Sequence, residues 1–532
     1  GAANSGQGGS GSGGITTAGV SAKSGGAGGS GIVVVRYLGG IASSGGTVGT
    51  GSATGYSFNT FTTTGANTLT FNSMAATISG VISGLGSLTV SPAANGQFTF
   101  TNNNRYSGST TLSNGTLQVG TGSTVGSLGV TTANVINNGS LIFNRSDALS
   151  YTGAFSGTGT LTVSTGSLAL NGGATYTGTT VLSATSSSIA YNYNVPPSTP
   201  SFSGTGTVTI APASGSSFTS AFTPNYTFAS TLTGLTLGSS SNTQDITFNN
   251  ALNINGPITV DAGNVTFGSS LQSTATNADI TIRAKTNITN SALTTMTTAG
   301  GNILLASNVD GNTTTYGYVQ LRSGLVATTV GGNITIGGGN LTGSSYAMGG
   351  AAENVTEGVR VDVRLNLNTS GGSTGGGNIS IRGKSYARAV QAGYGASGFG
   401  VYFLTSSTDS INSGTGTIYI DGFSQTSGSN YGSGVVFSTT NLYTIKSANT
   451  TANAIQIIGT ATGTSGWSWG LEAKSSLDIL ATGAGGGINI KTSQQNTGNN
   501  YDAVFRGNTN ILARSGPINL IGGLGIVNGI LY

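Results

Sequence analysis

One short pattern constrains the fold of this chain more than any other feature of its sequence. In the C-terminal half, a Gly/Asn turn followed by apolar residues two positions apart recurs at spacings of about 30 to 45 residues. Such alternation is typical of a strand with one buried face, and its recurrence predicts units that stack on one another. The copies are GGNILLA (300–306), GGNITIG (331–337), GGNISIR (376–382), GTGTIYIDG (414–422), NAIQIIG (453–459), GGGINIK (485–491) and SGPINLIG (515–522).

Each of these units contains further apolar segments that complete a set of three strands. An aromatic-Gly segment with a short strand lies between successive copies, and several units add a third strand. Three short strands joined by Gly, Asn and Ser turns form one coil of a parallel β-helix, with coils about 4.8 Å apart. The middle segments are YGYVQLRSG, GFGVYFLTS, YGSGVVFST, GWSWGLEAK and NYDAVFRGN, and the third segments are NLYTIKS, SLDILAT and NILARSG.

A different repeat occupies the N-terminal half. GLGSLTV (84–90), GTGTLTV (157–163) and GTGTVTI (204–210) share the pattern G-x-G-[ST]-[LV]-T-[VI]. Each copy is followed, about twenty residues later, by a tyrosine, and the third copy lacks the Gly found after Tyr-Ser/Thr in the first two. The alternation of apolar residues with Thr again predicts strands with one buried face. The tyrosines are Tyr106, Tyr176 and Tyr226.

These two sets of repeats resemble the repeats of bacterial surface proteins. The segment RYSGSTTLSNGTLQVG is similar to the autotransporter-associated β-strand repeat, and the resemblance covers roughly residues 80–235. The GGNIxI units, roughly 240–532, resemble the repeats of filamentous-haemagglutinin-type adhesins. The resemblance implies an all-β, right-handed parallel β-helix (β-solenoid) built from irregular Gly/Thr/Asn-rich repeats.

The two repeat families suggest a division of the chain into three parts. Five of the eight prolines lie between 196 and 224, and Pro is excluded from central strands of a sheet, so we place the junction there. The predicted parts are a glycine-rich segment ending in a β-strand (1–40), autotransporter-type β-strand repeats (41–225) and a haemagglutinin-like β-helix (226–532).

The composition excludes several kinds of chemistry. The chain has no His and no Cys, and only 6% of its residues are charged, so imidazole bases, thiolate nucleophiles and His- or Cys-ligated metals are excluded. We expect no cofactor, no metal site and no catalytic residue. The 17 Lys and Arg residues, against 13 Asp and Glu, form no basic cluster, which argues against nucleic-acid binding.

The densest group of charges is ENVTEGVRVDVR, residues 353–364. One interpretation takes Glu353, Glu357 and Asp362, with Arg360 and Arg364, as the site of a polysaccharide-processing β-helix enzyme. The interpretation that we favour notes the strict alternation from Val359 to Asn368, and predicts a solvated strand face with cross-strand ion pairs. Carboxylates are scattered thinly elsewhere, and glycosidases need two at a set separation. An enzyme is therefore the remote alternative.

Aromatic side chains on the outward positions have two possible roles. They could stack on sugars, but aromatics beside the Gly corners of repeats more often pack stacked coils together, and we favour packing. The residues concerned are Tyr402, Tyr419, Trp467 and Trp469.

These observations together predict a non-enzymatic extracellular structural protein of the bacterial cell surface. We expect a processed product or an excised piece that does not span a membrane, because no apolar run approaches about 18 residues. The chain would assemble with copies of itself into a fibre, filament or sheath, since the apolar stretch INLIGGLGIVNGILY carries no polar cap. The alternative is a rod-like passenger segment of a large adhesin, which binds cell-surface glycans or receptors.

The segment GGAGGSGIVVVRYLGG (25–40) offers a candidate joint between subunits. It resembles glycine-rich segments of phage tail and bacterial surface proteins that close on a Gly-Ile-Val-Val-x-Arg-Tyr strand. One interpretation is a flexible leader followed by the first strand of the solenoid. The other is a detachable strand that pairs with a neighbouring subunit. The residues of this candidate joining strand are Ile32, Val33, Val34, Val35, Arg36, Tyr37 and Leu38.

Overall fold

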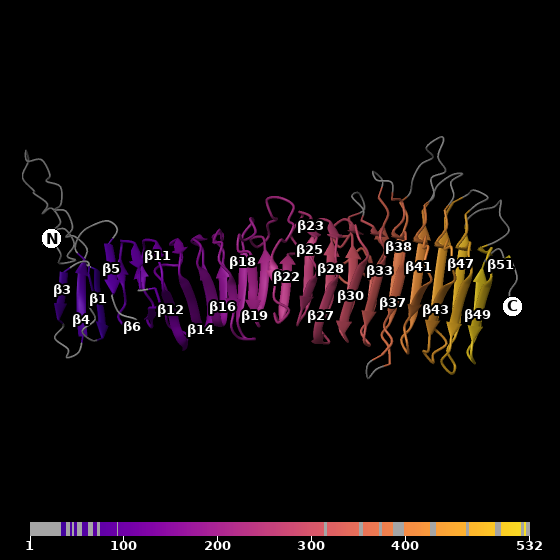
Figure 1. The fold of residues 1–532 in the computed structure, drawn as a ribbon. Coiled ribbons are helices and arrows are strands. Elements are labelled where there is room, and N and C mark those ends of the chain that lie inside the picture. Colours follow the sequence, from indigo (N-terminus) through magenta and orange to yellow (C-terminus); the bar gives the residue numbers. More distant parts are fainter. Residues whose placement is uncertain are drawn as a thin grey trace, which may run out of the picture. The chain divides into compact units, whose positions relative to one another are not determined.

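The computed structural model of the chain consists of β-strands and turns, with no helix among the residues that it describes (Figure 1). Contacts divide the chain into two compact units, Gly1–Ser214 with Tyr226–Leu232, and Gly215–Asn225 with Thr233–Tyr532. The structure describes the strands between Val33 and Phe71 by their backbone, and residues 75–522 except for 93, 313–316, 351–354, 372–374, 387–397, 426–431, 464–467 and 495–501, together with the strand Ile526–Val527.

The C-terminal unit is a stack of coils whose strands form three parallel sheets. The first sheet contains β22 (Gly234–Gly238), β25 (Ile258–Ala262), β28 (Ile280–Ala284), β31 (Ile303–Ser307), β34 (Ile334–Gly338), β38 (Ile379–Lys384), β41 (Ile418–Ser424), β44 (Ile455–Ala461), β47 (Ile488–Gln494) and β50 (Ile518–Gly522), with β35 (Ala347–Met348) paired to part of β38. The second contains β23 (Ile246–Phe248), β26 (Val265–Phe267), β29 (Ile288–Asn290), β32 (Val319–Leu321), β36 (Val359–Val361), β39 (Val401–Phe403), β42 (Val435–Phe437), β45 (Leu471–Ala473), β48 (Ala503–Phe505) and β51 (Ile526–Val527). The third contains β24 (Leu252–Ile254), β27 (Leu271–Thr276), β30 (Thr294–Ala299), β33 (Leu325–Thr329), β37 (Leu365–Asn368), β40 (Asp409–Asn412), β43 (Tyr443–Ser447), β46 (Leu477–Ala481) and β49 (Thr509–Ala513).

The register of these sheets confirms the predicted parallel β-helix. Successive copies of the sequence pattern pair residue for residue, so that Ile379 lies beside Ile418, Ile418 beside Ile455 and Ile455 beside Ile488. All four isoleucines are fully buried. Stacked isoleucines of this kind form a continuous interior, and the residues between them face outward.

The asparagine of the GGN turn has its own structural role. Its side-chain oxygen accepts a hydrogen bond from the backbone N–H of the equivalent residue in the next coil. The column begins at Asp279 Oδ1, which accepts from Asn302 N at 2.7 Å, and continues from Asn302 Oδ1 to Asn333 N at 2.9 Å and from Asn333 Oδ1 to Asn378 N at 2.8 Å. Each bond satisfies a backbone donor at a corner where the sheet hydrogen bonds are interrupted.

The coils of the C-terminal unit differ in length mainly at one corner, the connection from the first sheet to the second. After β31 this connection runs from 308 to 318, after β34 from 339 to 358 and after β38 from 385 to 400. The connections from the second sheet to the third stay short, for example 322–324 and 474–476. Inserted residues therefore leave the register of all three sheets unchanged.

The N-terminal unit also consists mostly of stacked parallel strands. One stack contains β5 (Asn67–Phe71), β8 (Leu88–Val90), β11 (Thr110–Leu112), β13 (Val135–Asn137) and β15 (Phe155–Ser156). A second contains β6 (Ala75–Ile78), β9 (Gln97–Phe100), β12 (Thr116–Ser123), β14 (Ser140–Tyr151), β16 (Thr160–Leu170), β18 (Ser188–Asn192) and β20 (Thr207–Ala211), and β16 also begins a stack with β17 (Thr180–Leu182), β19 (Ser201–Gly204) and β21 (Thr227–Phe228). A short parallel pair joins β7 (Ser83–Gly84) to β10 (Arg105–Tyr106), and β2 (Ser43–Ser44) pairs antiparallel with β5.

The Tyr-[Ser/Thr]-Gly-x-Thr motif has a direct structural explanation in this unit. The Tyr106 and Tyr176 side chains are both buried, and each hydroxyl forms a 2.6 Å hydrogen bond with the Thr four residues later, Thr110 or Thr180. The glycine of the motif lies against the preceding coil, since a Cβ at Gly178 would lie 2.0 Å from the Gly159 carbonyl oxygen. In the third copy, which lacks this glycine, the tyrosine hydroxyl donates to the Pro197 carbonyl oxygen at 2.8 Å.

Candidate functional site

The charged segment 353–364 has a different geometry from the one that its sequence suggested. Val359 and Val361 are buried in β36, but Val363 is 41% exposed, because the chain turns the corner to β37 there. The expected unbroken alternation from Val359 to Leu367 is therefore wrong at this one position. Glu353 lies outside the described residues.

The ion pairs of this segment are local, whereas cross-strand pairs were expected. The Arg360 guanidinium bonds Asp362 at 2.6 Å and lies 3.6 Å from Glu357. The adjacent residue in the next coil is Tyr402, whose ring centroid lies 5.8 Å from Arg360 Cζ. Glu357, which precedes the alternating residues, is buried, and this burial raises the pKa of its carboxyl. Arg364 lies apart, with Nε donating to Ser407 Oγ at 3.3 Å.

The arrangement therefore holds Glu357 and Asp362 in a structural network around Arg360. A glycosidase needs one free carboxyl as acid and another as nucleophile or base. Both carboxyl groups here face the same guanidinium. Among the described residues, no group of three or more Asp and Glu side chains converges in a way that could hold a metal ion.

The outward aromatic residues pack between coils. The ring centroids of Tyr402 and Phe399 lie 4.8 Å apart with the rings tilted by 53°, and Trp469 is buried with Arg506 Cζ 5.1 Å from its ring. The Tyr419 hydroxyl donates to Asp421 Oδ2 at 3.0 Å, and burial together with that carboxylate raises the pKa of Tyr419 to about 12. Trp467 lies outside the described residues.

The candidate joining strand is paired within the chain. Val33–Leu38 form β1, which pairs antiparallel with β4 (Tyr56–Phe61), and β4 in turn pairs with β3 (Thr47–Thr50). Ile32 lies outside the described residues. In the order β1-β4-β3, β1 occupies an edge of this small sheet, which is the position from which a strand can pair with another chain.

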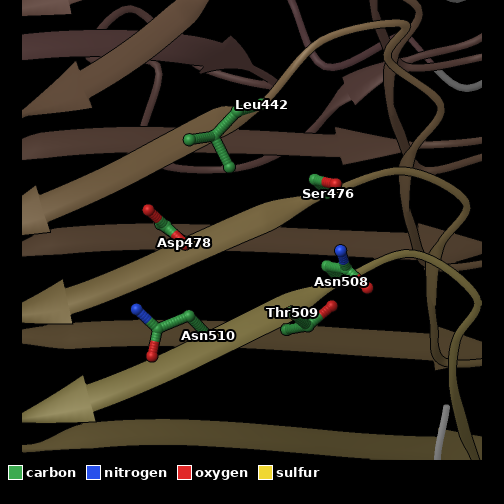
Figure 2. Close-up of a pocket in the computed structure, with 6 residues that line it drawn as sticks. All are labelled: Leu442, Ser476, Asp478, Asn508, Thr509 and Asn510. Atoms are coloured by element: carbon green, nitrogen blue, oxygen red, sulfur yellow. The ribbon is translucent and has the colours of Figure 1, made fainter. Parts of the chain in front are cut away.

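A surface hollow of about 360 Å³ lies on the outer face of the third sheet. Figure 2 shows its lining side chains on three successive coils, those of β43, β46 and β49. Three of its lining residues lie in the turns before these strands, two lie at the second positions of β46 and β49, and Thr509 is the first residue of β49. The lining residues are Leu442, Ser476, Asp478, Asn508, Thr509 and Asn510.

Several polar side chains of this hollow have no partner within the chain. Among the described residues, the side chains of Ser476, Asp478, Asn508 and Asn510 form no hydrogen bond and no ion pair. Leu442, at the opposite end of the hollow, is 40% exposed. The site is therefore a patch of unused donors and acceptors beside one apolar side chain. The sequence did not single out these residues, although aligning NLYTIKS, SLDILAT and NILARSG as stacked third strands would have brought Asp478 and Asn510 together.

Comparison with known proteins finds one short region of similarity. A 57-residue segment of the chain is 53% identical to the adhesin BmaC autotransporter of Brucella suis biovar 1 (strain 1330). That segment is 11% of this chain and 2% of the length of the adhesin. No family model matches the chain, and no solved structure matches it.

The part of the chain that the structure describes contains no helix long and apolar enough to cross a bilayer.

Proposed function

We propose that this chain is a passenger-type segment of a bacterial surface adhesin, with no enzymatic activity. The observation that carries the proposal is the 53% identity to an autotransporter adhesin over 57 residues, in a chain whose described part consists mostly of stacked parallel coils. A solenoid of this kind suits adhesion because it repeats one outward face many times and exposes it to a partner. The location that follows is the outside of the bacterial cell.

Adhesion can be tested directly with the purified chain. Beads coated with the folded chain should attach to host cells or to neighbouring bacteria more than beads coated with the heat-denatured chain. Antibodies raised against the chain should also label intact cells of the native bacterium. Labelling that appears only after lysis, or equal attachment by folded and denatured chain, would contradict the proposal.

A second candidate function is self-assembly into a fibre, which the exposed strand β50 favours. Among the described residues, β50 pairs on one edge, with β47, and its Ile518 and Ile521 side chains are 44% and 53% exposed. An apolar strand with one open edge can serve as a template for a strand of another copy. Electron microscopy of the purified chain should then show fibres, whereas monodisperse monomers at high concentration would exclude them.

A further inference from the structure

We propose that the hollow formed by Leu442, Ser476, Asp478, Asn508, Thr509 and Asn510 binds a neutral hexopyranose unit of a glycan. The inference rests on the proposed adhesive function, because it names the class of partner that such an adhesin recognises through this surface.

The positions of the lining residues follow from the register of the third sheet. Leu477 pairs with Tyr443 and with Thr509, and Asp478 pairs with Asn510. Residues paired in adjacent coils lie about 4.8 Å apart, and outward residues two positions apart along a strand lie about 6.6 Å apart. Ser476 and Asp478 on one coil, with Asn508 and Asn510 on the next, therefore form a polar grid the size of a single sugar ring.

The chemistry of this grid fits hydroxyl groups. The Asp478 carboxylate offers acceptors only, while the amides of Asn508 and Asn510 and the Ser476 hydroxyl offer both donors and acceptors. A sugar hydroxyl both donates and accepts, so adjacent hydroxyls of one ring can bond a carboxylate on one coil and an amide on the next. Leu442 supplies an apolar surface for the C–H face of the ring, and this mixture of apolar and polar groups is typical of ligand sites.

The charge of the hollow selects against anionic sugars. Asp478 is the one charged residue among those that line it, and a carboxylate repels the carboxylate of a uronate or a sialic acid. One carboxylate with amide and hydroxyl neighbours also falls short of the acidic ligand sets that hold Ca²⁺ in proteins. A neutral polyhydroxylated ligand is therefore the class that satisfies every unused group.

The lack of internal partners distinguishes these side chains from the asparagines that connect the coils along the first sheet. Asn302, Asn333 and Asn378 each accept a backbone hydrogen bond from the next coil, and Asn519 donates to the Asn489 side chain at 2.7 Å. Asn508 and Asn510 do neither. Their amides contribute nothing to the stacking of the coils and are free for a ligand.

Binding can be measured by saturation-transfer NMR with a panel of neutral methyl hexopyranosides, and with methyl glucuronide and sialic acid as anionic probes. We expect at least one neutral glycoside to give a saturable signal whose affinity weakens about tenfold in the double variant D478A/N510A, because the variant loses the hydrogen bonds of both side chains. Gln456→Ala, which removes an outward amide from β44 on the first sheet, should bind as the parent chain does.

Three results would overturn the inference: no neutral glycoside bound, equal binding by D478A/N510A and the parent chain, or stronger binding of the anionic probes. Far-ultraviolet circular dichroism of each variant verifies that the coils stay folded. Bead attachment measured with D478A/N510A separates this inference from the adhesive function, because attachment that persists without glycoside binding leaves adhesion standing and rejects only the site.

Discussion

At the scale of single residues, two buried tyrosines show how the surroundings of a hydroxyl determine whether it adds to the stability of the fold or lowers it. The Tyr106 hydroxyl bonds Thr110 at 2.6 Å in the N-terminal unit. The Tyr443 hydroxyl, in the interior beside Asp409, has no hydrogen-bond partner among the residues that the structure describes. A buried polar group that is paired adds a modest amount to stability, whereas an unpaired one costs its full desolvation.

Substitution by phenylalanine should therefore have opposite effects at the two positions. Tyr106→Phe leaves the Thr110 hydroxyl unpaired and should lower the free energy of unfolding by about 1 kcal/mol. Tyr443→Phe removes an unpaired hydroxyl and should raise that free energy by about 1 kcal/mol. Urea denaturation followed by circular dichroism gives both values, and a loss of stability in Tyr443→Phe would contradict the interpretation of its surroundings.

The same tyrosines make the N-terminal unit sensitive to alkali. Burial raises the pKa of Tyr106 and of Tyr176 from 10.0 to about 12. Because the pKa in the folded state is the higher one, the stabilisation is fully present below pH 10 and is lost as pH rises toward 12. The loss amounts to about 3 kcal/mol for each tyrosine.

Urea midpoints measured between pH 8 and pH 12 should show this decline. The double variant Y106F/Y176F removes both ionisable groups, so its midpoints should fall less steeply over the same pH range. Equal slopes for the variant and the parent chain would show that these two tyrosines do not cause the alkaline loss.

At the scale of the strand and its turn, glycine sets how closely two coils approach. A Cβ on Gly178 would lie 2.0 Å from a backbone oxygen of the preceding coil, and the coil cannot move away without losing sheet hydrogen bonds. A Cβ on Gly350 would meet its nearest atom, Tyr318 Cε1, at an ordinary contact distance of 3.6 Å. Alanine at these two positions therefore compares a methyl group that overlaps a backbone oxygen with one that makes an ordinary contact.

Gly178→Ala should lower the free energy of unfolding by about 1–3 kcal/mol, because the added methyl group overpacks a rigid contact. Gly350→Ala should change it by less than about 0.5 kcal/mol. Thermal or urea unfolding monitored by circular dichroism gives both values. A neutral Gly178→Ala would mean that the coils can separate locally without loss of stability.

Strand-level features were also the part of the fold most accessible from the sequence. A period of two in Ile, Val and Leu, with Gly and Asn at the turns, is sufficient to predict strands such as β38 and β41 and their stacking. The turn at Val363 was not predictable in this way, because a corner of a β-helix can interrupt a strand without any Gly or Pro. The alternation of residues continues through it although the backbone changes direction.

At the scale of the whole molecule, the role of the N-terminal strand β1 remains a prediction. It pairs with β4 in the chain and occupies a sheet edge. If β1 joins subunits, a variant lacking residues 1–40 should lose fibres in electron micrographs while its circular dichroism spectrum stays that of a β-protein. Intact fibres from this variant would exclude β1 as the joint.

Only part of the candidate binding site could be predicted from the sequence. Matching the third strands SLDILAT and NILARSG would have placed Asp478 beside Asn510. The hollow itself also includes residues of the turns, and Leu442 and Asn510 are 68 positions apart in the chain, so the positions of the turn residues had to come from the structure. No local motif marks Ser476, Asp478 or Asn508 as functional.

The variable corner between the first and second sheets has a consequence for how such a chain changes over time. Residues added or removed there, as between β34 and β36, leave the pairing of β34 with β38 and of β32 with β36 in place. Length differences between related chains should therefore accumulate at that corner, while the third sheet keeps its spacing. Where selection favours a changed outer surface, this corner can change in length and sequence while the stacked sheets stay the same.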